Sequence, residues 1–243
     1  MTEVVILPGL DGTAKLHGAF SALLGEFGVR AHAIAYPPDQ PLSYEELEFL
    51  VRDQLPSAGQ FILLGESFSG PVATRIAAHP PPGLVGLVLS TTFAKAPVPA
   101  LARLAPLLRF APARPPQPLV SWLLLGPWQT PDLRLALDTA LRQVSPIVIR
   151  SRAAAALRVN VTELLPSVTL PVLQLVASHD RLLAKATAAG LSRGLPSCRT
   201  ITVRGPHLLL QASSELCAKE VAAFALGLGP NNSFKPMPLR GTA

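Results

Sequence analysis

Short apolar runs alternate with longer amphipathic segments along most of this chain. The first runs are "TEVVILPG" and "VRAHAIAYP", and "GTAKLHGAFSALLGEFG" between them carries apolar residues at helical spacing. Strands that are apolar at nearly every position are typical of parallel sheets covered by helices on both faces. We therefore predict an α/β fold with a mostly parallel sheet of about six strands. The six runs are residues 2–9, 29–37, 60–67, 83–91, 171–178 and 198–205.

The alternation stops between residues 95 and 168, where prolines are frequent and no run resembles a strand. We interpret this segment as an inserted helical cap, with residues 1–94 and 169–228 forming the two parts of the core. Residues 229–243 lack periodicity and are rich in Pro and Asn, so we expect a flexible tail. Both tryptophans, Trp122 and Trp128, belong to the cap, where they either fill its small core or line an acyl pocket.

The stretch "FILLGESFSGPVATRIAAHP" begins as an apolar run and continues as a helical pattern, with two serines at the turn between them. Ordinary turn chemistry explains Gly and Ser there. However, "GESFSG" between a strand and a helix also resembles the G-x-S-x-G motif, which holds a serine on a strained turn. Ser69 stands where that motif has its second glycine, and Gly70 follows it. We predict that Ser67 is the nucleophile, and Ser69 is the alternative.

A serine hydroxyl needs a base to remove its proton and an acid to orient that base. Asp180 follows the run "PVLQLVAS", and His207 follows the run "CRTITVRG". Because the carboxyl ends of parallel strands share one edge of a sheet, we expect both side chains to lie near Ser67. The predicted triad is Ser67, His207 and Asp180. His179 is the rival base, but adjacent residues that leave a strand point in different directions.

Acyl transfer also needs donors for the developing oxyanion. The turn "PGLDG" after the first run directs the backbone N–H of Leu10 toward the site, and the second donor is the N–H of Phe68, just after the nucleophile. The turn lacks the spacing of a dinucleotide fingerprint, and no phosphate-binding lysine follows it. The alternative is a plain connection between a strand and a helix.

The remaining candidates for chemistry are few. The five histidines form no metal-binding pattern, and we interpret His17 and His79 as structural. Cys198 and Cys217 have no ligand spacing, so we expect two reduced core residues. We predict no metal and no cofactor. No apolar run reaches the ~18 residues that span a bilayer, and the N-terminus has no signal-peptide pattern, so we expect a cytoplasmic protein without a membrane span.

Four segments together resemble a known superfamily. "ILPGLDGT", "LLGESFSGP", "VASHDRLL" and "RGPHLLLQ" are similar to the oxyanion, nucleophile, acid and histidine segments of α/β-hydrolases, in particular small cap-bearing carboxylesterases. The resemblance covers nearly the whole chain except the cap and the tail. It implies a serine hydrolase whose cap closes over the pocket. Pro8 and Gly9 replace the family's His-Gly, and the chain begins at the third strand of the family's full sheet, so we expect differences in loop geometry and strand number.

The net charge of +6 is concentrated in the cap. A basic cap attracts acidic partners or anionic head groups, and the resemblance extends to pimeloyl-carrier-protein methyl ester esterases, on whose cap an acidic carrier protein docks. The alternative, which we favour, is that the arginines serve solubility and reflect a GC-rich, Ala/Leu/Pro-heavy composition. We predict no nucleic-acid binding, because stacking aromatics are almost absent. Between residues 96 and 160 two aspartates, Asp132 and Asp138, oppose Arg103, Arg109, Arg114, Arg134, Arg142, Arg150, Arg152 and Arg158.

From these observations we expect a carboxylesterase that cleaves small-molecule carboxylic esters through an acyl-enzyme. A thioesterase or a carrier-protein methyl ester esterase is the enzymatic alternative. The non-enzymatic alternative is a binding member of the same fold that keeps the pocket as a receptor.

Overall fold

The computed structural model describes residues 2–98, 107 and 116–228. Within them, six strands form one parallel sheet in the order β2-β1-β3-β4-β5-β6. The prediction of a six-stranded parallel sheet is confirmed. The strands are β1 Glu3–Leu7, β2 Arg30–Ala33, β3 Phe61–Glu66, β4 Leu84–Ser90, β5 Val172–Ala177 and β6 Cys198–Val203.

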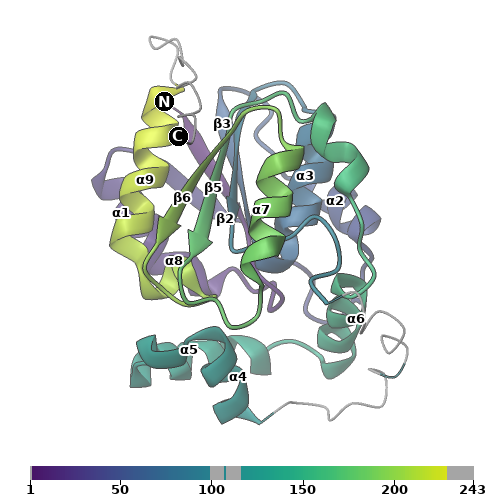
Figure 1. The fold of residues 1–243 in the computed structure, drawn as a ribbon, viewed down its shortest axis with the longest axis vertical. Helices are drawn as coiled ribbons and strands as arrows, with labels where there is room; N and C mark the ends of the chain where they lie inside the picture. The colour runs from purple at the N-terminus through teal and green to yellow at the C-terminus, as the bar shows by residue number, and fades with distance from the viewer. Residues whose placement is uncertain (1, 99–106, 108–115, 229–243) are drawn as a thin grey trace, which may run out of the picture.

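Helices cover both faces of the sheet (Figure 1). On one face, α1 and α9 enclose a cluster that includes Phe20, Leu24 and Val221. On the other face, α2, α3 and α7 enclose a second cluster that includes Leu47 and Ile76. The helices outside the cap are α1 Gly18–Glu26, α2 Tyr44–Asp53, α3 Gly70–Ala78, α7 Lys185–Gly194, α8 Leu209–Ala212 and α9 Ser214–Gly227, with the 3-10 turns η1 Lys15–His17, η2 Ser67–Ser69 and η5 Thr162–Ser167.

Strand β3 is a central strand that ends just before the candidate nucleophile, at the carboxyl edge of the sheet, and every residue in β3 is buried. Phe61 and Leu63 pack in the α2/α3/α7 cluster, whereas Ile62 and Leu64 pack in the α1/α9 cluster. This two-sided burial explains why the run is apolar at consecutive positions instead of alternating. Each such side chain contributes about 1.5–3 kcal/mol of burial free energy, so the strand is a rigid support for the turn after it.

The segment between β4 and β5 contains helices α4, α5 and α6, which lie beyond the carboxyl edge of the sheet (Figure 1). We call these three helices the cap. Prolines stand in the first turn of each cap helix, where a missing N–H costs nothing, and this explains why a proline-rich segment is helical. The bounds are α4 Gln117–Leu124, α5 Pro131–Arg142 and α6 Pro146–Ala156, with the 3-10 turn η4 Gly126–Trp128.

An isolated antiparallel bridge between Lys95 and Asn160 joins the two ends of the cap segment. After that bridge, Val161, Leu165 and Val168 pack against the sheet in the α2/α3/α7 cluster. The expected domain limits of 95 and 168 stay a prediction. The expected tail, residues 229–243, lies outside the described residues.

In the described part of the chain, no helix is both long enough and apolar enough to cross a membrane. Cys198 and Cys217 are free thiols, and Cys217 is fully buried on α9, where burial raises the pKa of its thiol to about 12.

Candidate active site

Ser67 lies at the turn between β3 and α3, in a backbone conformation that L-residues rarely adopt. Its φ is +48°, and its side chain lies close to the carboxyl edge of the sheet. The turn is tight enough to require small neighbours. A Cβ on Gly65 would lie 2.7 Å from the Cβ of Ala73, and a Cβ on Gly70 would overlap the side chain of Thr92. The local sequence thus predicts a strained serine at this turn, and the structure has one.

Ser69, the alternative nucleophile, is fully buried, and its hydroxyl contacts Pro8 and Tyr36. Its hydroxyl donates a hydrogen bond to the carbonyl oxygen of Pro8 and accepts one from the phenolic hydroxyl of Tyr36, at 2.7 Å. Ser69 therefore has a bonding role at the position where the motif has glycine.

His207 and Asp180 meet Ser67 at this edge of the sheet. The Oγ of Ser67 lies 2.8 Å from the Nε2 of His207, and the Nδ1 of His207 lies 2.8 Å from Oδ2 of Asp180. A carboxylate is only an acceptor, so Nδ1 carries the proton and Nε2 accepts the proton of the serine hydroxyl. The three residues predicted from separate segments are therefore in one hydrogen-bonded chain.

The Asp180 carboxylate is held by its own loop. Its Oδ1 accepts hydrogen bonds from the backbone N–H groups of Leu182 and Leu183, both at 2.8 Å. Burial alone would raise the pKa of Asp180, but the hydrogen bond and charge of His207 and the two backbone donors outweigh it. The pKa of Asp180 is therefore below its usual value, and the group is an anion that orients the imidazole.

The other histidines lie away from Ser67. The ring of His179 packs on Trp128 with 5.0 Å between centroids, and its Nδ1 lies 2.7 Å from the hydroxyl of Ser178. His79 ends α3 on the surface. The rival base is therefore engaged elsewhere.

His17 has a partner that the sequence analysis missed. Its Nε2 lies 2.8 Å from Oε2 of Glu66, the residue just before Ser67, and both side chains are only 1% exposed. Gln211 donates a second hydrogen bond to the same oxygen at 3.3 Å. The sequence signal that could have revealed this pair is Glu66, because a charged residue at the end of an otherwise apolar, buried strand requires a partner.

Opposing effects act on the protonation of His17. Burial disfavours the charged imidazolium, but the charge and hydrogen bond of Glu66 favour it more strongly, with a smaller effect from Asp11. The pKa of His17 is therefore above its ordinary value. A protonated His17 neutralises the carboxylate of Glu66, next to Ser67 in the chain.

The predicted oxyanion donors both border the space in front of Ser67. Residues 9–12 form a turn closed by a 3.0 Å hydrogen bond from the N–H of Gly12 to the carbonyl of Gly9, which leaves the N–H of Leu10 available. The N–H of Phe68 belongs to the first helical turn after the strand, where backbone donors have no partner within the helix. The ring of Phe68 stacks on Tyr44 at 4.8 Å, which keeps that turn in place.

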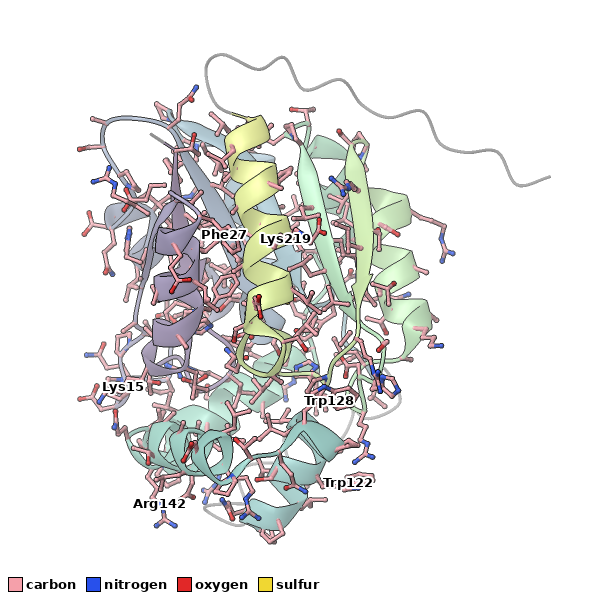
Figure 2. The ribbon with its side chains drawn as sticks, turned by 90° about the vertical axis from the view of Figure 1, so that its left-hand side faces the viewer. Lys15, Phe27, Trp122, Trp128, Arg142 and Lys219 are labelled. Carbon is pink, nitrogen blue, oxygen red and sulfur yellow. The ribbon has the colours of Figure 1, made fainter. Side chains whose placement is uncertain are left out.

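Ser67 and His207 open into a cavity of about 410 Å³ beneath the cap. Cap helices and the loops after β1, β5 and β6 supply its mainly apolar walls, among them Val120, Leu124, Leu137, Ile149 and Ala153. Neither tryptophan borders this cavity in the described part of the chain. Trp122 is half-exposed on the outer side of the cap, and Trp128 lies closer to the strands (Figure 2).

The described residues contain no group of three or more His, Cys, Asp or Glu side chains able to hold a metal ion. The polar groups around the cavity are instead those of the serine, the histidine and a few side chains at the rim, including the ion pair of Asp138 and Arg142 at 2.6 Å.

No protein-family model and no curated protein matches the chain in sequence. Solved structures match it over nearly its whole length. An esterase from Exiguobacterium antarcticum has a TM-score of 0.81 at 15% identity over 93% of this chain and 92% of its own. The enol-lactonase from Burkholderia xenovorans LB400 has a TM-score of 0.80 at 16% identity, over 92% of this chain and 90% of its own. Proline iminopeptidase from Mycobacterium smegmatis has a TM-score of 0.72 at 20% identity, over 93% of this chain and 90% of its own.

At such low identity these matches establish the fold and leave the reaction open. The chain has the α/β-hydrolase fold, as the sequence motifs predicted.

Proposed function

We propose that this protein is a serine hydrolase of carboxylic esters. The observation that carries the proposal is the continuous chain from Asp180 through His207 to Ser67, with both hydrogen bonds at 2.8 Å, ending in an apolar cavity. The similarity in fold to an esterase and a lactonase supports the same class of reaction.

In the first half-reaction His207 removes the proton from Ser67 as its oxygen attacks the ester carbonyl. The resulting imidazolium is stabilised by the Asp180 carboxylate. The N–H groups of Leu10 and Phe68 bind the oxyanion, and each such donor is worth roughly 10²–10³ in rate. His207 then protonates the departing alcohol, which leaves an acyl group on Ser67.

In the second half-reaction His207 activates a water molecule that attacks the acyl group. The same donors bind the second oxyanion, and Ser67 recovers its proton when the acid leaves. A thioester would follow the same steps, with a thiol as the leaving group. The mainly apolar walls of the cavity favour an acyl or alcohol chain without charge.

Hydrolysis of p-nitrophenyl esters from acetate to palmitate tests this proposal. We expect turnover by the wild type and a loss of about 10⁴-fold or more in Ser67→Ala. Ser57→Ala, at an exposed position in a loop, is the matched serine control and should retain full activity. Intact-mass analysis after treatment with a fluorophosphonate should show one adduct in the wild type and none in Ser67→Ala. A wild type that neither turns over an ester nor forms an adduct would favour the receptor alternative.

A carrier-protein ester is a narrower version of the same function. Arg134 and Arg158 are exposed on the cap side, whereas Arg152 is buried and is not available to a partner. Arg103, Arg109 and Arg114 lie outside the described residues. The docking of an acidic carrier thus stays a prediction, tested by comparing Arg134→Glu and wild type on a carrier-bound methyl ester and on the free ester.

A further inference from the structure

Arg152 is a cation buried inside the molecule. It projects from cap helix α6, and only 1% of it is exposed. A guanidinium that leaves water loses its hydration, and burial accordingly lowers the pKa of Arg152. No ion pair among the described residues includes it. Its charge must therefore be stabilised by other groups.

Those groups are the Asp11 carboxylate, whose nearby charge favours the ionised guanidinium, and three backbone carbonyls. The Nη1 of Arg152 donates to the carbonyl of Leu10 at 3.1 Å and to that of Asp11 at 2.7 Å, and its Nη2 donates to the carbonyl of Pro37 at 3.0 Å. The guanidinium also lies 5.5 Å from the centre of the Tyr36 ring, within the range of a cation–π contact. The planar fork thus joins two loops that follow β1 and β2.

The turn at residues 9–12 is shaped to receive this group. Gly12 has a φ of +68°, and a Cβ there would lie 2.8 Å from the Cζ of Arg152. A glycine is thus required both by the backbone and by the guanidinium. The N–H of Gly12 closes this turn, and the bonds from Arg152 restrain it through the carbonyls of Leu10 and Asp11. Residues 9–11 of the turn border the same cavity as Ser67.

Holding those carbonyls restrains the direction of the N–H of Leu10. That N–H shares a peptide plane with the Gly9 carbonyl, which accepts from Gly12, and the Leu10 carbonyl lies in the next plane, related to it by the backbone dihedrals of Leu10. A small rotation of the turn would move the donor away from the oxyanion, and catalysis is sensitive to displacements of about 1 Å. The Pro8 carbonyl is held separately, by Ser69 from the elbow.

We propose that Arg152 is a positioning residue that fixes the oxyanion turn from the cap. The cap then contributes to transition-state stabilisation as well as covering the cavity. This inference rests on the proposed ester hydrolysis, because it assigns the Leu10 N–H a role in that reaction.

A role limited to anchoring the cap makes a different prediction. Loss of the cap would open the cavity and weaken the binding of every apolar ligand, which raises KM. Loss of the oxyanion donor would instead lower kcat and leave ground-state binding unchanged. The kinetic parameters therefore separate the two roles.

The test compares Arg152→Met and Arg152→Lys with Arg158→Gln, an exposed arginine just beyond the same helix. On a p-nitrophenyl ester we expect Arg152→Met to lower kcat by about 10- to 100-fold with KM within about twofold of wild type. Affinity for an alkyl boronic acid, which forms a tetrahedral adduct with serine, should fall in the same proportion. Inhibition by a primary alcohol of equal chain length should not change. Arg152→Lys, which keeps the charge but loses the fork, should recover part of kcat.

Amide hydrogen exchange in the free protein supplies a readout without turnover. We expect the amides of residues 9–13 to exchange roughly tenfold faster in Arg152→Lys than in wild type or Arg158→Gln, while β3 is unchanged. Unchanged exchange in that turn, or an activity loss that appears only in KM and in alcohol binding, would overturn the assignment. If the wild type hydrolyses no ester, the proposed function fails, while the exchange result still decides whether Arg152 holds the turn.

Discussion

The Ser69 hydroxyl donates a hydrogen bond to the carbonyl oxygen of Pro8, although the two residues are 61 positions apart in the chain. It thereby connects the turn at Ser67 to the loop after β1, which carries the proposed oxyanion donor Leu10. The same hydroxyl accepts the proton of Tyr36, so that each of the three polar groups has a partner in a buried region.

Ser69→Ala should therefore damage both stability and catalysis. The change leaves the Pro8 carbonyl and the Tyr36 hydroxyl buried without partners, which costs about 1–3 kcal/mol of unfolding free energy for each group. We expect kcat to fall roughly tenfold because the oxyanion loop loses one of its restraints. Urea denaturation and steady-state kinetics measure the two effects. Tyr36→Phe is the matched control: it should lose stability but keep the bond to Pro8, and with it kcat. Wild-type kcat in Ser69→Ala would contradict this account.

Asp180→Asn tests the orientation of the imidazole. The two backbone donors at Oδ1 would hold the oxygen of asparagine in the same place, so its NH₂ group would face Nδ1 of His207. That donor selects the tautomer with a proton on Nε2, which cannot accept the proton of Ser67. We expect kcat to fall by about 10⁴-fold while the fold is retained. Near-wild-type kcat with correct folding would show that Asp180 does not select the tautomer; unfolding of the variant would show that its role in the loop is dominant.

The sheet and the hydrogen-bonded arrangement of Ser67, His207 and Asp180 were predictable because the relevant signals are local in sequence. A strand buried on both faces, such as β3, is apolar at consecutive positions whatever the rest of the chain does. Asp180 and His207 each follow such a strand, and parallel strands end at one edge. Three local patterns thus determined a contact between residues 140 positions apart in the chain.

The role of Arg152 could not be predicted in this way. In the sequence it is one of eight arginines between residues 96 and 160, and composition treats all of them as surface charge. Its burial depends on how α6 lies over the turn at residues 9–12, which is a tertiary arrangement without a local pattern. The same holds for the pairing of His17 with Glu66, since the segment that contains His17 gives no indication of its partner.

The buried pair of His17 and Glu66 should make stability depend on pH. Because the pKa of His17 is raised in the folded protein, the folded state holds a proton that the unfolded chain releases near pH 6.5. The resulting stabilisation is complete below pH 6.5 and is lost as the pH rises through the folded-state pKa. The denaturant concentration at the unfolding midpoint of the wild type should therefore decrease as the pH rises from 6.5 through the folded-state pKa of His17.

Glu66→Gln should reverse that dependence. Without the carboxylate, burial is the dominant effect on His17 and disfavours its charged form, so stability should decrease when the pH falls below 6.5. At pH 6 we expect a loss of about 3–5 kcal/mol, as for other broken buried pairs. The exposed pair of His32 and Glu3, at 3.0 Å, provides the control, and Glu3→Gln should change stability by less than about 1 kcal/mol. A pH profile of Glu66→Gln that parallels the wild type would refute the ion pair.

The apolar cavity predicts how rate depends on chain length. Each methylene that enters it contributes about 0.8 kcal/mol, so kcat/KM should rise about fourfold per added methylene until the cavity of about 410 Å³ is filled. Ala153, on α6, borders the cavity, and Ala153→Phe should shorten the optimal chain while leaving the acetate ester unaffected. Ile147→Phe, at a position of the same helix that is 64% exposed and does not border the cavity, should keep the wild-type profile. An optimum that is the same in both variants would mean that substrate chains do not enter this cavity, and a profile without an optimum would mean that chain burial does not contribute to the transition state.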